Sequence, residues 1–284
     1  MKIDRFGINN FVLFNGDHFY FCYRLRINLS RCIFINFAVE VENLNFSYNS
    51  GFNIHDLSFK LEEKVICGLT GNNGSGKTTL LRLIVGLLKP SSGLIKIFNK
   101  TLTRDKQSLW ELRKSIGFLF QNPDDQLFAP TIEEDVGFGA RNLKLDEEEV
   151  KYRVKWALEA VDLFEFKHYS PFNLSWGQKK RAALAGLLVM KPKLLILDEP
   201  FANLDFKSIY NHLKILEKLR KEMNITIFFT SHNLFFVEHW AETMLFLDDG
   251  KIIFNGEPKE GLRNQNVKEL LGSYDDILTL LKND

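Results

Sequence analysis

Apolar residues follow different spacings along this chain, and each spacing predicts a different kind of element. Short continuous runs are typical of parallel strands that are buried on both faces of a sheet. Runs of this kind occupy residues 64–70, 116–120, 194–197 and 225–230. Alternating apolar and polar residues instead predict a pair of antiparallel strands at residues 39–46 and 57–61, ahead of the first run.

Helical spacing separates several of these strands. Apolar residues recur every three or four positions at residues 80–88, 150–161 and 182–189. Asp146 and Glu149 resemble a capping box ahead of the second of these helices. Residues 93–98 predict a further strand, and residues 244–254 predict a hairpin that turns at Asp248-Asp249-Gly250. Alternation of strands and helices in this order predicts an α/β fold.

A glycine-rich segment joins the first buried run to the helix that follows it. It fits the pattern Gly, four residues, Gly-Lys-[Ser/Thr], whose glycines let backbone N–H groups converge on one anion. Lys77 adds a cation for the β- and γ-phosphates, and Thr78 offers a hydroxyl to Mg²⁺. We therefore predict a triphosphate site made of Gly71, Asn72, Asn73, Gly74, Ser75, Gly76, Lys77, Thr78 and Thr79.

Two carboxylates end the run at residues 194–197. A strand that is buried on both faces has no structural use for them, because a charge is costly to bury without a partner. We predict that Asp198 holds Mg²⁺, directly or through water, and that Glu199 polarises an attacking water molecule.

Polar residues also end two other buried runs. Gln121 and His232 come where ligands of open α/β sheets collect, at the carboxyl ends of strands. A histidine alone is more often a hydrogen-bonded structural residue, but at this strand end we expect His232 to contact a γ-phosphate.

Two further positions suit a nucleotide less specifically. Ser175 and Gly177 open the helix that carries residues 182–189, and a helix N-terminus can hold an anion, although an ordinary capped helix has the same sequence pattern. Tyr48 ends the first antiparallel strand, where its ring suits either adenine stacking or simple packing.

Size and composition narrow the possibilities. A chain of 284 residues, 45% of them hydrophobic, predicts one nucleotide-binding domain with subdomains and appendages. The 37 basic and 36 acidic residues give a net charge of +1, which offers no support for a nucleic-acid partner.

The cysteines Cys22, Cys32 and Cys67 form no Cys-x-x-Cys pair, so we expect neither disulfides nor zinc. We therefore expect a cytosolic protein. We find no apolar run of about 18 residues and expect no membrane span.

Residues 1–37 differ from the remainder, with many aromatic rings among basic side chains. Arg24, Arg26 and Arg31 interrupt the apolar pieces too often for a signal peptide. Two interpretations stay open. One is a segment that docks on a membrane surface or a partner. The other, which the lack of an amphipathic period favours, is a disordered or wrongly assigned start.

From about Ala38 to about Glu260 the set of motifs resembles the ATP-binding subunit of ABC transporters. Gly71 to Thr78 matches the Walker A motif, and Leu194 to Glu199 matches Walker B with its catalytic Glu. The remaining matches are Gln121 to the Q-loop, Leu174 to Gln178 to the signature, Asn203-Leu204-Asp205 to the D-loop, His232 to the switch histidine and Tyr48 to the adenine-stacking aromatic.

A narrower resemblance is to the ATPases of energy-coupling-factor importers, the cobalt, nickel and vitamin group. It depends on residues 120–128 and 131–139 and on Gln178-Lys179-Lys180-Arg181. Three features depart from the general pattern. Trp176 replaces the usual signature Gly, Phe201 and Phe206 replace the usual residues around the D-loop, and residues 1–37 have no counterpart.

The resemblance implies a phosphate-loop NTPase (RecA-like) core with an antiparallel β subdomain and a helical signature subdomain. The expected parts are an N-terminal extension at 1–37, the ATPase domain at 38–260 with its helical subdomain at about 122–190, and a helical tail at 261–284. It also implies an ATPase that powers a metal-ion or vitamin importer, at the cytoplasmic face of the membrane, with transmembrane subunits as partners. The alternatives are a soluble ABC ATPase without transport, or the ATPase of another transporter class.

The same resemblance implies roles for single residues. ATP and Mg²⁺ are the expected cofactors, with Thr78, Gln121 and Asp198 around the metal. Glu199, His232, Gln121 and Lys77 are the expected catalytic residues. Each motif occurs once, so Ser175, Gly177 and Gln178 are expected to close the ATP of a second ABC ATPase, in a homodimer or a heterodimer.

Overall fold

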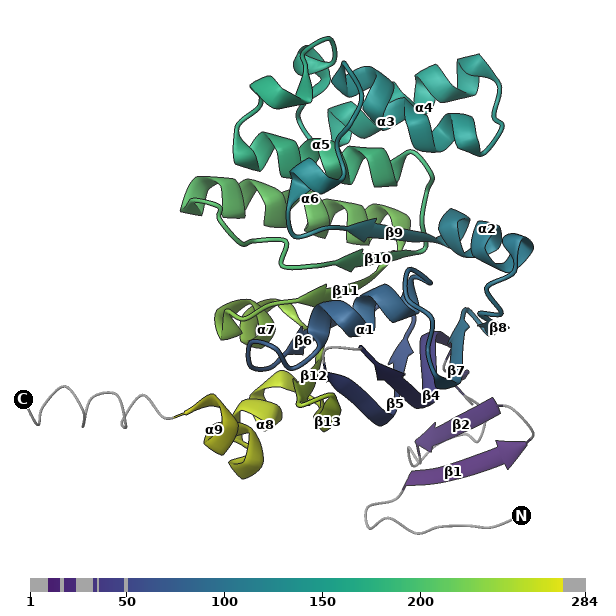
Figure 1. Cartoon of the computed structure of the whole chain (residues 1–284), viewed down its shortest axis with the longest axis vertical. Helices are drawn as coiled ribbons and strands as arrows, with labels where there is room; N and C mark the ends of the chain where they lie inside the picture. The colour runs from purple at the N-terminus through teal and green to yellow at the C-terminus, as the bar shows by residue number, and fades with distance from the viewer. Residues whose placement is uncertain (1–9, 16–17, 24–32, 35, 49–50, 273–284) are drawn as a thin grey trace, which may run out of the picture.

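A six-stranded sheet forms the centre of the structure (Figure 1). The structure is a computed structural model and describes residues 10–15, 18–23, 33–34, 36–48 and 51–272. The strand order is β13-β12-β6-β11-β10-β9, parallel throughout except for β12 with β13. Their bounds are β6 (Ile66–Thr70), β9 (Ile116–Leu119), β10 (Leu194–Leu197), β11 (Thr226–Thr230), β12 (Thr243–Asp248) and β13 (Lys251–Gly256).

The central strands are apolar because both of their faces are covered. Every residue of β6, β10 and β11 is buried, as the continuous apolar runs predict. On one face lies α1 (Lys77–Ile84), which buries the leucines of its apolar stripe against the strands. The parallel strands therefore bring their carboxyl ends, and the loops that follow them, to one edge of the sheet.

A second, four-stranded sheet packs beside this core in the order β5-β4-β7-β8. Its strands are β4 (Phe37–Ser47), β5 (Asn53–Glu62), β7 (Ser92–Ile97) and β8 (Lys100–Thr101), paired antiparallel. The alternating pattern in the sequence predicts β4 and β5 as this antiparallel pair, and the structure confirms them. Their inward side chains share one apolar cluster with α1.

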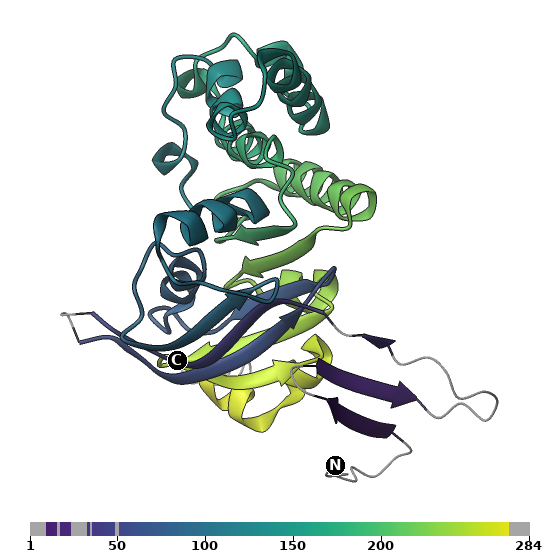
Figure 2. The same cartoon turned by 90° about the vertical axis from the view of Figure 1, so that its right-hand side faces the viewer.

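A group of helices stands on the far side of β9 and β10, at the top of Figure 2. The helices α3 (Ile132–Asn142), α4 (Glu147–Ala160) and α5 (Trp176–Leu188) pack against one another. The 3₁₀ turn η1 (Pro123–Asp125) precedes α3, and the turns η2 (Phe164–Phe166) and η3 (Pro171–Asn173) lie between α4 and α5. The Asp146 carboxylate accepts the backbone N–H of Glu149 at 2.9 Å, which confirms the predicted start of α4.

Three more helices flank the sheet: α2 (Lys106–Ser115), α6 (Phe206–Met223) and α7 (Leu234–Trp240). The chain then forms α8 (Pro258–Arg263) and α9 (Gln265–Leu271), and Val267 of α9 is fully buried in the core. This part of the predicted helical tail is helical, whereas residues 273–284 lie outside the described residues.

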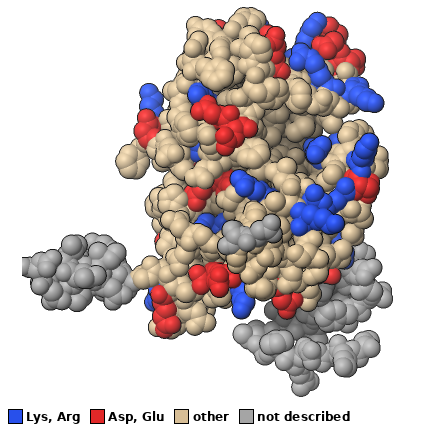
Figure 3. Space-filling view, in the orientation of Figure 1, with Lys and Arg blue, Asp and Glu red and all other residues tan. Residues whose placement is uncertain are grey.

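The N-terminal residues form β1 (Asn10–Asn15), β2 (His18–Tyr23) and β3 (Ile33–Phe34), three antiparallel strands in that order. The remainder of residues 1–35 lies outside the described part, so both interpretations of this extension stay predictions. In the described ranges, no helix is long and apolar enough to cross a membrane. Basic and acidic side chains are interspersed on the face that Figure 3 shows.

Candidate functional site

The phosphate loop connects β6 to α1 with backbone conformations that only glycine adopts easily. Gly71 has φ 144° and Gly76 has φ 104°, both in the left-handed region. A Cβ atom on Gly71 would lie 1.9 Å from the carbonyl oxygen of Leu247. Gly76 is also the N-cap of α1, and because it has no side chain, the first N–H groups of the helix keep no capping partner. The loop thus presents free amides at a helix N-terminus, which suits a phosphate.

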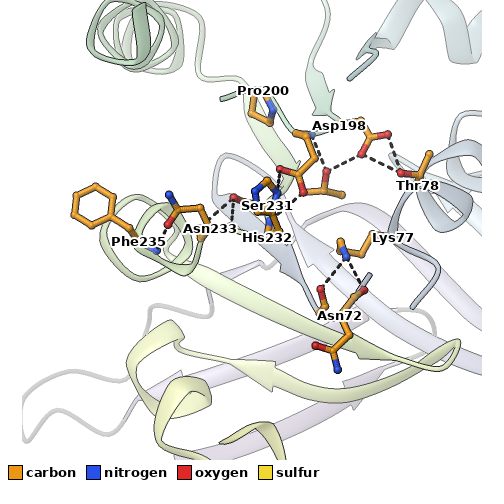
Figure 4. A network of polar contacts seen from close by, with 12 residues as sticks. Asn72, Lys77, Thr78, Asp198, Pro200, Ser231, His232, Asn233 and Phe235 are labelled. Carbon is orange, nitrogen blue, oxygen red and sulfur yellow. Dashed lines mark hydrogen bonds and ion pairs between the residues drawn. The ribbon is translucent and has the colours of Figure 1, made fainter. Parts of the chain in front are cut away.

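Two polar side chains of this loop, those of Ser75 and Lys77, make no hydrogen bond to residues outside the loop in the described part of the chain. The hydroxyl of Ser75 is buried, with 3% of the residue exposed, and lacks a hydrogen-bond partner among the described residues. Lys77 Nζ donates to the carbonyl oxygens of Gly71 at 2.8 Å and Asn72 at 2.9 Å (Figure 4). Burial lowers the pKa of Lys77, while the nearby carboxylates act in the opposite direction. A phosphate group would satisfy the orphaned hydroxyl and pair with the ammonium.

Other predicted residues of the loop differ in what they face. The side chain of Asn72 is turned away from the cradle, because its amide donates to the carbonyl oxygen of Leu270 in α9 at 3.0 Å. Asn73 and Gly74 are exposed, and Thr79 is half-buried on α1. Asn72 therefore offers a ligand only its backbone, and its side chain ties the loop to the C-terminal helices.

Thr78 and Asp198 meet across the sheet edge. The hydroxyl of Thr78 donates to Asp198 Oδ2 at 2.9 Å, although 120 residues separate them in the chain. Asp198 is 4% exposed, and its other oxygen accepts the hydroxyl of Thr230 at 2.7 Å. Hydroxyl and carboxylate oxygens are the donors that Mg²⁺ prefers, so this pair fits that ion.

Glu199 is held at each of its polar groups. Its carboxylate lies 2.9 Å from the backbone N of His232 and 2.9 Å from Nδ1 of the same residue. Its backbone N–H donates to the hydroxyl of Thr230 at 2.8 Å. Glu199 also has φ 47°, an unfavourable conformation for a residue with a side chain. The carboxylate is therefore fixed at the ends of β10 and β11, close to the phosphate loop.

Gln121 lies at the same edge of the sheet. Strands β9 and β10 run parallel with Leu119 opposite Leu197, and the N–H of Asp198 donates to the carbonyl oxygen of Leu119 at 2.9 Å. Gln121 follows two residues later and is exposed. The structure thus brings Gln121 to the strand ends where Asp198 and Glu199 lie.

The signature residues form a separate group at the start of α5. Ser175 is the N-cap, its hydroxyl accepts the N–H of Gln178 at 3.3 Å, and the Gln178 side chain accepts the N–H of Ser175 at 2.9 Å. A Cβ atom on Gly177 would lie 3.0 Å from the hydroxyl of Ser208. In the described chain, no hydrogen bond joins Ser175 or Gln178 to the phosphate loop. In one copy of the chain, the signature residues and the phosphate loop are therefore two separate groups.

Two residues of the site have no counterpart in the sequence-based predictions. Thr230 bridges Asp198 and Glu199, and its signal is a hydroxyl at the last position of an apolar strand. Phe52 lies against the phosphate loop, because a Cβ atom on Gly76 would be 2.4 Å from the tip of its ring. Tyr48 is close by: its N–H donates to the carbonyl oxygen of Phe52 at 3.0 Å, and its ring meets Phe46 edge-on at 4.7 Å.

A family model and curated relatives both resemble this chain over most of the residues that carry the site. A family model described as ABC transporter matches residues 54–202. The energy-coupling factor transporter ATP-binding protein EcfA of Carboxydothermus hydrogenoformans is 41% identical over 251 residues, which cover 88% of this chain and 92% of that protein. The protein of the same name from Methanocaldococcus jannaschii is 44% identical over 225 residues, 79% of this chain and 80% of the other.

Solved structures agree. The structure of cbiO1 from Clostridium perfringens, described as part of the ABC transporter complex cbiONQ, has a TM-score of 0.74 and 37% identity, covering 87% of this chain and 99% of that one. A dimeric ATP-binding cassette in a post-hydrolysis state with ADP and Pi has a TM-score of 0.70 and 27% identity, covering 78% and 98%. Both confirm the predicted fold class.

Proposed function

This chain belongs to the ABC transporter family. We propose that its phosphate loop, Glu199 and His232 perform the ATP hydrolysis that powers a membrane importer. The protein is an ATPase of the energy-coupling factor type. The observation that carries the assignment of residues is the fixed carboxylate of Glu199, which contacts His232 and whose charge acts on Lys77.

ATP is held by the phosphate loop in this proposal. The amides of residues 71–79 donate hydrogen bonds to the phosphates, the Lys77 ammonium neutralises part of their charge, and the orphaned Ser75 hydroxyl gains an acceptor. Tyr48 stacks on the adenine. Thr78, Gln121 and Asp198 would hold Mg²⁺, which would neutralise charge on the phosphate oxygens.

Hydrolysis then requires a positioned water molecule. Glu199 aligns the water and accepts its proton as the oxygen attacks the γ-phosphorus. The bond from the γ-phosphorus to the bridging oxygen breaks, and the products are ADP and inorganic phosphate. With both ring nitrogens protonated, His232 donates from Nδ1 to Glu199 and from Nε2 to a γ-phosphate oxygen. Lys77 stabilises the charge that develops on the phosphoryl oxygens.

The working unit is a dimer, as in the dimeric cassette that this chain resembles. A single chain keeps the start of α5 apart from its own phosphate loop, so we propose that Ser175, Gly177 and Gln178 close the ATP that a second ABC ATPase binds. The second subunit is another copy of this chain or a similar ATPase. ATP bound between the two then favours the closed dimer.

The helical group offers a surface for transmembrane subunits. A groove of about 640 Å³ lies between it and the sheet core, and its apolar lining includes the exposed rings of Phe128 and Phe138. Phe128 and Phe138 belong to two of the three segments that resemble importer ATPases, residues 120–128 and 131–139. We propose that transmembrane subunits dock here, at the cytoplasmic face of the membrane, and that the cargo is a metal ion or a vitamin.

A pull-down from detergent-solubilised native membranes tests the importer assignment. We expect an integral membrane protein to co-purify with the chain, with or without a second ATPase, and mass spectrometry would identify both. Phe138→Asp, in the groove, should lose the membrane protein while keeping ATP binding. Recovery of soluble partners alone would contradict the proposal and favour a soluble ABC ATPase.

A further inference from the structure

Lys180 is a fully buried lysine in the signature helix, and the reaction described above gives it no role. It lies on α5, and its relative exposure is 0%. Lysine is almost never fully buried unless its ammonium has partners, because desolvation of the charge is costly. The partners of this ammonium therefore indicate why the chain places it there.

The ammonium of Lys180 binds the backbone that carries Glu199. Its Nζ donates to the carbonyl oxygen of Glu199 at 2.8 Å and to the carbonyl oxygen of Pro200 at 3.1 Å. These two carbonyls belong to consecutive peptide groups, so one side chain fixes the orientation of both. No other buried lysine occurs in the described residues.

The backbone at this point needs an external restraint. Glu199 has φ 47°, and a non-glycine residue in the left-handed region is strained unless its surroundings hold it. Thr230 holds the N–H of Glu199 on one side, and Lys180 holds its carbonyl oxygen on the other. The direction of the Glu199 side chain follows from this backbone conformation.

The carboxylates near Lys180 favour the protonated, cationic form of its side chain. Burial lowers the pKa of Lys180 to about 8, and the nearby carboxylates of Glu199 and Asp198 oppose that change. The side chain thus stays largely protonated at neutral pH. An ammonium has three donors, and two of them are accounted for by the carbonyls of Glu199 and Pro200.

We propose that Lys180 is a positioning residue that ties the signature helix to the backbone of Glu199 and so sets the direction of the catalytic carboxylate. The proposal rests on the role of Glu199 proposed above. Lys180 is five residues beyond the cap residue Ser175, about 7.5 Å along the helix. If the start of this helix moves when a partner's ATP binds there, the side chain of Lys180 therefore moves the backbone of Glu199 with it.

Arg181 provides a matched control on the same helix. It also donates from a long cationic side chain to backbone carbonyls, in this case that of Val161 at 3.0 Å, beyond the end of α4. It therefore fastens α5 to a remote helix end. A purely structural role of Lys180 predicts that Lys180→Met and Arg181→Met have equal consequences.

The test measures kcat, KM for ATP, ATP affinity and melting temperature on the full-length chain. We expect Lys180→Met to lower kcat about 10- to 100-fold with KM and ATP affinity unchanged, because a small displacement of a catalytic group has an effect of that size. Lys180→Gln keeps an N–H donor and should retain more of the activity than Lys180→Met. Arg181→Met should lower the melting temperature and leave kcat unchanged.

A combination with Glu199→Gln decides whether Lys180 acts through Glu199. If it does, Lys180→Met should cause no further loss of single-turnover rate in the Glu199→Gln background. Independent, multiplied losses would overturn the proposal, as would wild-type kcat in Lys180→Met, or in Lys180→Leu if the Met variant does not fold. Failure of the proposed function itself looks different, because the unmodified chain would then show no ATP hydrolysis.

Discussion

Glu199 and His232 are joined by two contacts, one from the backbone N–H of His232 and one from its ring Nδ1, each at 2.9 Å. The two residues follow the neighbouring strands β10 and β11, so the contacts connect two adjacent strand ends. The ring is largely exposed, with 63% of the side chain accessible, whereas the carboxylate is 11% accessible. The pair therefore combines a buried, fixed carboxylate with an exposed imidazole ring.

Replacement of His232 with Ala tests this pair. We expect kcat to fall about 100-fold, because the γ-phosphate loses a donor and Glu199 loses one of its two restraints. The backbone contact remains, so ATP affinity should change little. The measurement is steady-state ATPase activity together with ATP affinity.

His239→Ala is the control for that experiment. His239 lies on α7, the helix that begins two residues after His232, and its ring contacts Phe235 and Glu238 instead of the site. It should keep wild-type turnover. Equal activity of the two variants would remove His232 from the reaction.

The hydroxyl of Thr230 should matter for both Mg²⁺ and turnover. It donates to Asp198 and accepts from the N–H of Glu199, and Thr230→Val removes both hydrogen bonds at nearly constant volume. We expect the Mg²⁺ concentration for half-maximal activity to rise about tenfold, since outer partners of metal ligands have effects of that size. Stability should fall by about 1–3 kcal/mol, because a buried N–H loses its acceptor.

Thr226→Val separates these two consequences. Thr226 opens the same strand, is 1% exposed, and its hydroxyl accepts the N–H of Lys64 at 2.8 Å, at the other end of β11. We expect a similar loss of stability in urea unfolding and an unchanged Mg²⁺ dependence. A shift of the Mg²⁺ dependence in both variants would show that the effect is not specific to Thr230.

Site residues can be predicted from the sequence where their role follows from neighbouring residues in the chain. An apolar run, a glycine loop and helical spacing follow one another at residues 64–88, so the loop and α1 are predictable. Asp198 and Glu199 are conspicuous because charges rarely follow a buried run. In contrast, Lys180 contacts a backbone 19 residues away and Thr230 contacts one 31 residues away, and no local pattern encodes either contact.

Parts of the fold are hard to predict for a related reason. Only Leu112 of α2 is buried, so this helix has too narrow an apolar stripe to be recognised. Its start depends on Asp105, whose carboxylate accepts the N–H of Ser108 at 2.9 Å, a contact that many loops also make. Phe52 reaches the phosphate loop only because β4 and β5 fold back on each other beside α1.

The buried side chain of His212 should make the stability of the folded chain depend on pH. It is 1% exposed on α6, and neither ring nitrogen has a hydrogen-bond partner among the described residues. Burial, with a smaller contribution from the cations of Lys180 and Arg181, lowers its pKa from 6.5 to about 3. The unfolded chain takes up this proton near pH 6.5 and the folded chain does not. Stability from this group is therefore complete above pH 6.5 and is lost as the pH falls toward 3.

His212→Leu removes that dependence. At pH 5 the neutral histidine costs the folded state about 2 kcal/mol relative to pH 8, and the variant should escape this loss. Urea unfolding at pH 8, 6 and 5 measures it. The wild-type midpoint should fall more steeply than that of the variant, and parallel curves would contradict the assignment of the loss to His212.

ATP turnover by Glu199→Gln, measured on the same preparation as its ATP affinity, tests the central claim most directly. Glutamine keeps the shape of the side chain and can accept from the N–H of His232, but it cannot take a proton from water. We predict that turnover falls at least about 100-fold while ATP affinity is retained and ATP-dependent dimers accumulate. Turnover at the wild-type rate would contradict the assignment of Glu199 as the group that activates water.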